Sequence, residues 1–245
     1  SLYVVFLIIF FFFFGFSIIF PLFPSIAGHY LEIDSQNFFL KSIFSFIEFF
    51  ATPGLGGNKL VLFGGILGAL YSFLQFIAAP IWGRYSDKHG RRGILLISTL
   101  GMVISYIIWI FSGSFSLLSL SRIIGGTMSG NMSTATAVVA DVTTPAQRSK
   151  GMAIIGVAFA LGFILGPAIG GISSLFKFDA YFPSLVSWGI NPFSAAALIS
   201  LVFSFSALLI IYFKFEETLD SSREKSTHVR SSNPFKLFKP FLIRE

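Results

Sequence analysis

The stretch GRYSDKHGRR, residues 83–92, places six Arg, Lys, Asp and His side chains between two long apolar runs. The run before it is LVLFGGILGALYSFLQFIAAPIW, residues 60–82, and the run after it is GILLISTLGMVISYIIWIFSG, residues 93–113. Crossing a hydrocarbon layer of about 30 Å takes about 20 helical residues, so each run is long enough to span a membrane. We therefore predict that residues 83–92 connect two transmembrane helices at a membrane surface.

The composition of the whole chain supports this interpretation. Of its 245 residues, 54% are hydrophobic, 11% are charged and 33 are Phe, and the mean hydropathy is +0.82. This leaves too little polar surface for a soluble globular protein. Backbone N–H and C=O groups find no partners in lipid, so apolar blocks of this length form helices. We predict an all-α integral membrane protein, surrounded by membrane lipid, with six spans at about residues 3–24, 60–82, 93–111, 116–139, 151–174 and 191–213.

The Lys and Arg residues indicate how the spans are oriented. When the connections are taken alternately, thirteen fall on one side and three on the other, with Arg122 inside a span. Cytoplasmic loops carry such an excess, so residues 83–92 and both termini are predicted to be cytosolic. These charges orient helices, and the net charge of +6 therefore needs no nucleic-acid partner. The thirteen are Arg84, Lys88, Arg91, Arg92, Arg148, Lys150, Lys214, Arg223, Lys225, Arg230, Lys236, Lys239 and Arg244, and the three are Lys41, Lys59 and Lys177.

Two of the segments outside the predicted spans have features of their own. Residues 25–59 are expected to form an outer loop, in which NFFLKSIFSFIEFF, residues 37–50, carries polar residues at helical spacing among aromatic ones. Such a helix suits the membrane interface, and the segment ATPGLGGNK, residues 51–59, then breaks it. Residues 214–245 are mostly polar and of mixed charge, and we interpret them as the start of a cytosolic linker.

Three motifs resemble those of one family of membrane carriers. GRYSDKHGRR matches the pattern G-x-x-x-D-[RK]-x-G-R-R, which joins helices two and three in the major facilitator superfamily. RIIGGTMSG, residues 122–130, resembles R-x-x-x-G-x-x-x-G of helix four, and GFILGPAIGG, residues 162–171, resembles the antiporter signature G-x-x-x-G-P-x-x-G-G of helix five. The surrounding sequence is similar to drug:H+ antiporters of the tetracycline-resistance kind, and most of all to the tetracycline-transporter-like (Tetran) subgroup.

The resemblance implies a carrier of twelve helices, of which this chain would be the N-terminal six-helix half and the start of the central linker. It implies alternating-access efflux or exchange of small amphipathic organic molecules, including organic anions, with a proton as a further partner and no enzymatic reaction. The missing partner would be a C-terminal six-helix half, and residues 1–245 alone are not expected to transport. Two alternatives are a six-helix scaffold that moves nothing and an uncoupled facilitator of another small solute.

The resemblance assigns the cytosolic motif to a gate. Gly83 and Gly90 are expected to let the backbone turn tightly and approach a neighbouring helix. Arg91 is expected to pair with Asp141 at the cytosolic end of span four. The family interpretation is a latch that holds the outward-facing state and breaks when the two halves rock. The alternative is a connection whose cations only set the topology. The motif positions are Gly83, Asp87, Lys88, Gly90, Arg91 and Arg92.

Arg122 is the one charge that we place well inside a span, six residues from the outer side of span four, or about 9 Å along the helix. An intramembrane arginine is unfavourable without water or a partner, so we predict that it attracts an anionic substrate or tunes a proton site. The alternative is a side chain that snorkels to the outer interface. Tyr71, Gln75 and Asn131 are further candidates, which either line a cavity or join helices.

Glycines recur at helical spacing in spans four and five. On span five they share one face, where another backbone can come close, and Pro167 removes one helical hydrogen bond. We interpret this face as a sliding seam between the two halves of an antiporter, with an ordinary close-packed helix pair as the alternative. The residues of this packing signature are Gly126, Gly130, Gly162, Gly166, Pro167, Gly170 and Gly171.

Some chemistry has no support in the sequence. None of the six predicted spans contains Asp or Glu, so a proton-coupled carrier would need a titratable group from elsewhere. The chain contains no cysteine and no metal-binding or catalytic motif, so no metal and no cofactor are predicted.

Overall fold

The computed structural model describes residues 2–50 and 59–219, and every regular element in these ranges is a helix. The predicted all-α fold is confirmed. The elements are α1 (Leu2–Ser17), η1 (Phe20–Leu22), α2 (Phe23–Ile33), α3 (Phe38–Phe50), α4 (Lys59–His89), α5 (Arg91–Ile110), α6 (Phe115–Met128), α7 (Asn131–Val142), α8 (Arg148–Ser173), α9 (Phe178–Tyr181), η2 (Pro183–Trp188) and α10 (Ser194–Lys214).

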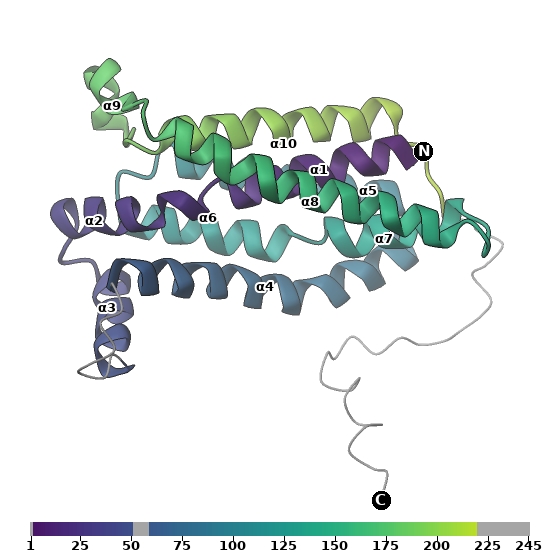
Figure 1. Cartoon of the computed structure of the whole chain (residues 1–245), viewed down its shortest axis with the longest axis horizontal. Coiled ribbons are helices and arrows are strands. Elements are labelled where there is room, and N and C mark those ends of the chain that lie inside the picture. Colours follow the sequence, from purple (N-terminus) through teal and green to yellow (C-terminus); the bar gives the residue numbers. More distant parts are fainter. Residues whose placement is uncertain (1, 51–58, 220–245) are drawn as a thin grey trace, which may run out of the picture.

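Most of these helices lie side by side along the long axis of the molecule (Figure 1). Five helical stretches of the described residues are long and apolar enough to cross a membrane, and they overlap five of the six predicted spans. The stretches are Leu2–Ile33, Lys59–His89, Arg91–Ile110, Arg148–Ser173 and Ser194–Lys214.

Span four is not the continuous helix predicted over residues 116–139. It divides into α6 and α7 at Ser129 and Gly130, and neither piece alone is long enough to cross a membrane. The indole Nε1 of Trp82 on α4 donates to the carbonyl of Thr127, 2.6 Å away, and the Ser129 hydroxyl donates to the carbonyl of Gly126. Side-chain donors thus bond backbone carbonyls near the end of α6. A side chain inserted into the backbone hydrogen bonds of a helix is a recognised cause of kinks and breaks.

The outer segment also differs from its prediction. Residues 25–33, which we placed in the outer loop, are helical and belong to α2. α1, η1 and α2 follow one another with only short breaks. Pro21 and Pro24 lie in the first turns of η1 and α2, where their missing N–H groups need no helical partner. α3 stands across the end of the bundle (Figure 1). The predicted break at residues 51–58 lies outside the described residues, and the interfacial position of α3 stays a prediction.

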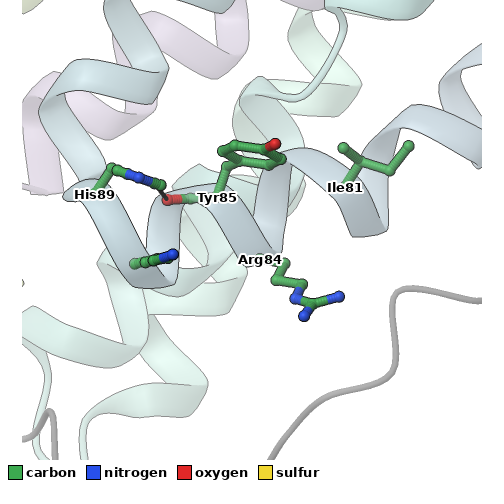
Figure 2. A pocket seen from close by; sticks show the side chains of 5 residues that line it. Ile81, Arg84, Tyr85 and His89 are labelled. Carbon is green, nitrogen blue, oxygen red and sulfur yellow. Dashed lines mark hydrogen bonds between the residues drawn. The ribbon is translucent and has the colours of Figure 1, made fainter.

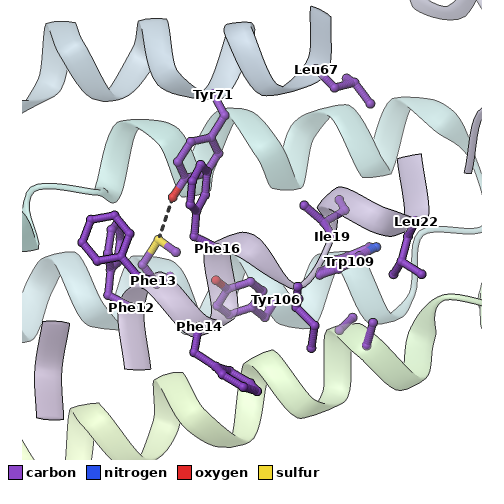
Figure 3. Packing of buried hydrophobic residues seen from close by; sticks show 14 of the residues in the cluster. Phe12, Phe13, Phe14, Phe16, Ile19, Leu22, Leu67, Tyr71, Tyr106 and Trp109 are labelled. Atoms are coloured by element: carbon purple, nitrogen blue, oxygen red, sulfur yellow. Dashed lines mark hydrogen bonds between the residues drawn. The ribbon is translucent and has the colours of Figure 1, made fainter. Parts of the chain in front are cut away.

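α1 occupies the centre of the bundle and packs mainly against α8 and α10. Figure 3 shows Phe13, Phe14 and Phe16 projecting from α1 in different directions. The Phe13 ring meets Phe159 of α8 with centroids 4.5 Å apart, and the Phe14 ring meets Phe203 of α10 at 4.2 Å. Aromatic pairs at these separations add to the stability of the core, so phenylalanine rings of the first span hold it to both α8 and α10.

The two ends of the bundle differ in charge. The C-terminal ends of α4, α7 and α10 lie at the same end as the N-terminal ends of α1, α5 and α8 (Figure 1). We call this the basic end, because all the described members of the thirteen-residue basic set belong to its helix ends and turns. The opposite end, with α3 and α9, is called the far end. Which end is cytosolic stays a prediction, and residues 220–245 of the predicted linker lie outside the described residues.

Candidate functional site

The charged motif at the basic end is mostly helical, which corrects the prediction of a loop. Gly83 to His89 continue α4, and Gly90 alone separates α4 from α5. Gly90 has φ of 94°, a conformation that glycine adopts readily, so its predicted turn is confirmed. The turn predicted at Gly83 is wrong, because Gly83 lies inside α4. A Cβ at this position would make an ordinary contact with Ser133 of α7, at 3.8 Å.

Arg91 is the centre of the motif. Its Nε donates to Oδ2 of Asp141 at 2.9 Å, and its Nη1 donates to Oδ1 of Asp87 at 2.5 Å and to Oγ of Ser86 at 2.8 Å. The structure therefore contains the Arg91–Asp141 pair that the sequence predicted, and it joins spans two, three and four. The side chains of Arg91 and Asp141 are only 7% and 16% exposed, whereas that of Asp87 is 41% exposed. We call Arg91, Asp87, Asp141 and Ser86 the gate cluster, after the role that the family resemblance implies, which stays a prediction.

Lys88 and Arg92 do not join the gate cluster through their side chains. Lys88 is exposed. It lines a hollow on α4 together with Ile81, Arg84, Tyr85 and His89. Figure 2 shows side chains of this hollow projecting from the last turns of α4, where the rings of Tyr85 and His89 stack with centroids 5.5 Å apart. The guanidinium of Arg92 turns instead toward the end of α10 and donates to the carbonyl of Tyr212 at 2.7 Å.

Arg122 lies inside the bundle and does not snorkel. The residue is 4% exposed, and its Cζ lies 4.4 Å from the centre of the Trp109 ring and 5.9 Å from that of Tyr106. Its Nε donates to the hydroxyl of Ser121 at 3.2 Å, but its Nη2 is buried and has no hydrogen-bond partner among the described residues. A buried cation with a free donor is therefore held between aromatic rings, in an arrangement suited to receiving an anion.

The other predicted polar residues have different surroundings. Tyr71 is buried, and its hydroxyl donates to the sulfur of Met102 on α5 (Figure 3). The amide of Asn131 donates to Oγ1 of Thr99 at 3.4 Å and accepts from Ser98, so this residue joins α7 to α5. Gln75 is half-buried on α4.

The glycines of span four permit close approach of α4. A Cβ on Gly126 would lie 3.0 Å from the carbonyl oxygen of Tyr71, and one on Gly130 would lie 2.3 Å from the Trp82 ring. These two positions therefore let α6 and α7 pack directly against span two.

The glycine face of α8 is occupied by α1 of the same bundle, so it is not free to form the predicted seam between halves. Gly162, Gly166 and Gly170 all face α1 of the same bundle, and a Cβ at Gly170 would lie 2.1 Å from the carbonyl oxygen of Ile18. Pro167 lies inside α8 between two of these contacts. The structure contains the alternative arrangement, a close-packed helix pair within this chain. Gly171 points away from this face, and a Cβ at its position would have no described atom within 4 Å.

We expect Gly166→Ala to destabilise the α1–α8 pair. The new Cβ would lie 2.0 Å from Oγ of Ser17 and 2.8 Å from the carbonyl oxygen of Phe14, so α1 has to move away. Overpacking of this kind lowers the free energy of unfolding by about 1–3 kcal/mol. Thermal unfolding of the purified protein in detergent measures this loss. Gly171→Ala is the matched control and should unfold at or above the wild-type temperature, and equal destabilisation by both variants would contradict the assignment.

Three important residues were missed from the sequence. Tyr106 and Trp109 lie three positions apart on α5 and so share a face, but nothing local to span three shows that this face meets Arg122. Glu217 follows α10 and was placed in the linker, yet its carboxylate lies against the backbone of the gate cluster. Within residues 2–50 and 59–219, no group of three His, Asp or Glu side chains is placed to hold a metal ion.

Comparisons with known proteins agree on one family. A family model described as Major Facilitator Superfamily matches residues 5–245. The mouse protein named major facilitator superfamily domain-containing protein 10 is 37% identical over 215 residues, which cover 87% of this chain and 43% of the relative. The class B tetracycline resistance protein of Escherichia coli is 35% identical over 165 residues, covering 67% of this chain and 37% of that protein.

A solved structure is also similar. The crystal structure of the human organic anion transporter MFSD10 (TETRAN) matches with a TM-score of 0.78 and 35% identity, covering 95% of this chain and 50% of that chain. The chain described here therefore spans half or less of the length of these relatives.

Proposed function

This chain belongs to the major facilitator superfamily, and we propose that it forms the first six-helix half of a carrier that moves small organic anions by alternating access. The observation that carries the substrate class is Arg122, which is buried beside Trp109 with a free Nη2 donor. A buried unpaired charge is unfavourable by several kcal/mol, so a site that retains one is suited to a ligand of opposite charge. The names of two relatives, an organic anion transporter and a tetracycline resistance protein, support a small organic substrate.

The gate cluster would close the cytosolic side of this path. Arg91 joins three spans through two carboxylates, and both ion pairs lie at the basic end, which we place in the cytosol. A cluster that links helix ends in one arrangement must separate when those helices move apart, so it biases the equilibrium between the two states. We place the substrate path among spans one, two, four and five.

A second six-helix half would cover the faces of α4 and α8. Only 22% of the most apolar window of each helix is buried within this chain, against 61% for α5. Helices of similar hydropathy with so little burial face either lipid or another part of the protein, and we propose that they contact a second half. Since no Asp or Glu lies within the six predicted spans, that half would also supply any proton-coupling carboxylate.

Transport by the complete carrier tests the proposal. We expect the full-length protein, reconstituted into liposomes, to take up a radiolabelled organic anion with saturation, because a carrier has a finite number of sites. A neutral analogue of the same size is the matched control and should enter much more slowly. Absence of saturable uptake for every anion tested would favour a scaffold that moves nothing.

A separate arm addresses the division into halves. Residues 1–245, purified alone and shown to be helical, are expected to give no uptake above empty liposomes, because the path would lack one wall. Saturable transport by this fragment as a monomer would contradict the two-half arrangement.

A further inference from the structure

The N-terminus of α5 has no cap of its own. Its N-cap residue is Gly90, which has no side chain, and its first turn contains no acidic residue. The first two residues of the helix are instead the cations Arg91 and Arg92. The first turn of a helix leaves N–H groups without partners, and its positive end disfavours nearby cations. The sequence around the gate motif is therefore locally unfavourable for starting a helix.

Glu217 supplies the missing cap from 126 positions away. Its Oε1 accepts from the backbone N–H of Arg91 at 2.8 Å, and its Oε2 accepts from that of Arg92 at 3.1 Å. A Cβ on Gly90 would lie 2.5 Å from Oε2 of Glu217. Glycine at position 90 thus serves two purposes: it adopts positive φ and leaves room for the carboxylate.

A second contact also joins the start of α5 to the end of α10, and here the charged side chain belongs to α5. The Nη2 of Arg92 donates to the carbonyl of Tyr212 in the last turn of α10. An anion therefore sits at the N-terminus of α5 and a cation at the C-terminus of α10, and both placements are favourable for the helix dipoles. We call the contacts of Glu217 and Arg92 the linker clasp.

We propose that Glu217 is a positioning residue for the gate cluster, through which the segment following span six holds Arg91 in place. The backbone N–H of Arg91 is bonded to Glu217 while its guanidinium bridges Asp87 and Asp141. A residue held at its backbone has fewer ways to withdraw its side chain. Movement of the linker away from α5 would release Arg91, so the linker acts on the gate. This inference rests on the proposed function, in which the gate cluster opens and closes.

The carboxylate of Glu217 is charged at neutral pH. Burial raises its pKa, but the N–H donors of Leu219, Arg91, Arg92 and Thr218 outweigh that effect and lower the pKa below its ordinary value. Because the pKa is lowered in the folded state, the stabilisation is present at neutral pH and is lost only as the pH falls through that lowered value. Glu217 therefore stays charged at physiological pH, and release of the clasp requires movement of the linker rather than protonation of this carboxylate.

Amide hydrogen exchange tests the clasp without requiring transport. In the full-length protein, peptides that contain Arg91 and Arg92 should exchange about tenfold faster or more in Glu217→Ala, since a hydrogen bond to a charged group is lost. Glu217→Gln keeps an acceptor and should lie between this variant and the wild type. The neighbouring exposed Glu216 provides the control, because Glu216→Ala should exchange like the wild type. Unchanged exchange in Glu217→Ala overturns the proposal.

A double-mutant cycle separates positioning of Arg91 from a general structural role. If Glu217 acts through Arg91, the shifts in unfolding temperature caused by Glu217→Gln and Asp141→Asn are not additive, because each substitution weakens the hold on the same residue. Additive shifts overturn the positioning role.

In the transport assay, Glu217→Gln should change the maximal rate by severalfold and leave KM for the anion unchanged. If the wild-type protein transported no anion, the proposed function would be wrong. Amide hydrogen exchange and the double-mutant cycle would still test whether the linker clasp exists and positions Arg91.

Discussion

Arg122→Met is expected to lower kcat/KM for organic anion transport by about 10- to 100-fold, because hydrogen bonds to a charged group contribute about 1.5–3 kcal/mol. The same substitution should leave the unfolding temperature unchanged or raise it. A cation above an aromatic ring gains about 2 kcal/mol when desolvated, whereas taking the charge out of water costs several kcal/mol. Since Nη2 of Arg122 has no partner among the described residues, the protein loses little when the charge is removed. Uptake into liposomes and thermal unfolding in detergent measure the two effects.

Two variants control this experiment. Arg122→Lys keeps the charge but loses the planar group that stacks on Trp109, so its transport should lie between those of Arg122→Met and the wild type. Leu120→Met alters an exposed residue of the same helix and should transport normally. A combination of normal transport and a lowered unfolding temperature in Arg122→Met would show that the arginine has a structural role only.

Arg91→Met is expected to lower the free energy of unfolding by about 3 kcal/mol, because it leaves the largely buried carboxylate of Asp141 without its partner. Asp87→Asn should lower it by less than about 1 kcal/mol, because the Asp87 side chain is 41% exposed and water replaces much of the interaction. Thermal or denaturant unfolding of the purified protein distinguishes these values.

The gate interpretation adds a functional expectation for the same two variants. Both should change the turnover number, since each weakens contacts that we propose to exist in only one of the two transport states. Lys88→Gln is the matched control: Lys88 is exposed, belongs to the same motif and has its side chain outside the gate cluster. If Arg91→Met and Asp87→Asn transported at the wild-type rate, the cluster would be a determinant of stability and topology alone.

The charged motif shows how far local sequence could lead. The pair between Arg91 and Asp141 was predictable, because both residues fall at span ends on the same side of the membrane and carry opposite charges. Its helical geometry was not, because a polar stretch with glycines resembles a loop when read locally. The helix continues to His89 and turns only at Gly90. Glu217 accepts the hydrogen bonds that stabilise this turn. It could not be predicted, because it lies 126 positions away in the sequence.

Span four and the glycine face of α8 are features that depend on contacts with other helices. Residues 125–134, GGTMSGNMST, are rich in Gly, Ser and Thr, but we predicted a continuous helix through them. The break lies where Trp82 of another helix bonds the carbonyl of Thr127. The spacing of Gly162, Gly166 and Gly170 predicted a face for close packing, and this was correct. Its partner in this structure is α1, whereas we had predicted a second half of the protein.

By itself, the sequence determined the membrane environment, the helical class and the charge difference between the two ends of the bundle. These properties follow from the apolar length of each block and from the need of backbone groups for hydrogen bonds in lipid, which depend on neighbouring residues alone. The tertiary structure decided which helix faces meet, where span four breaks, what surrounds Arg122 and what caps α5. Those outcomes depend on contacts between residues far apart in the chain, and in lipid such contacts arise from the fit of specific side chains rather than from hydrophobicity.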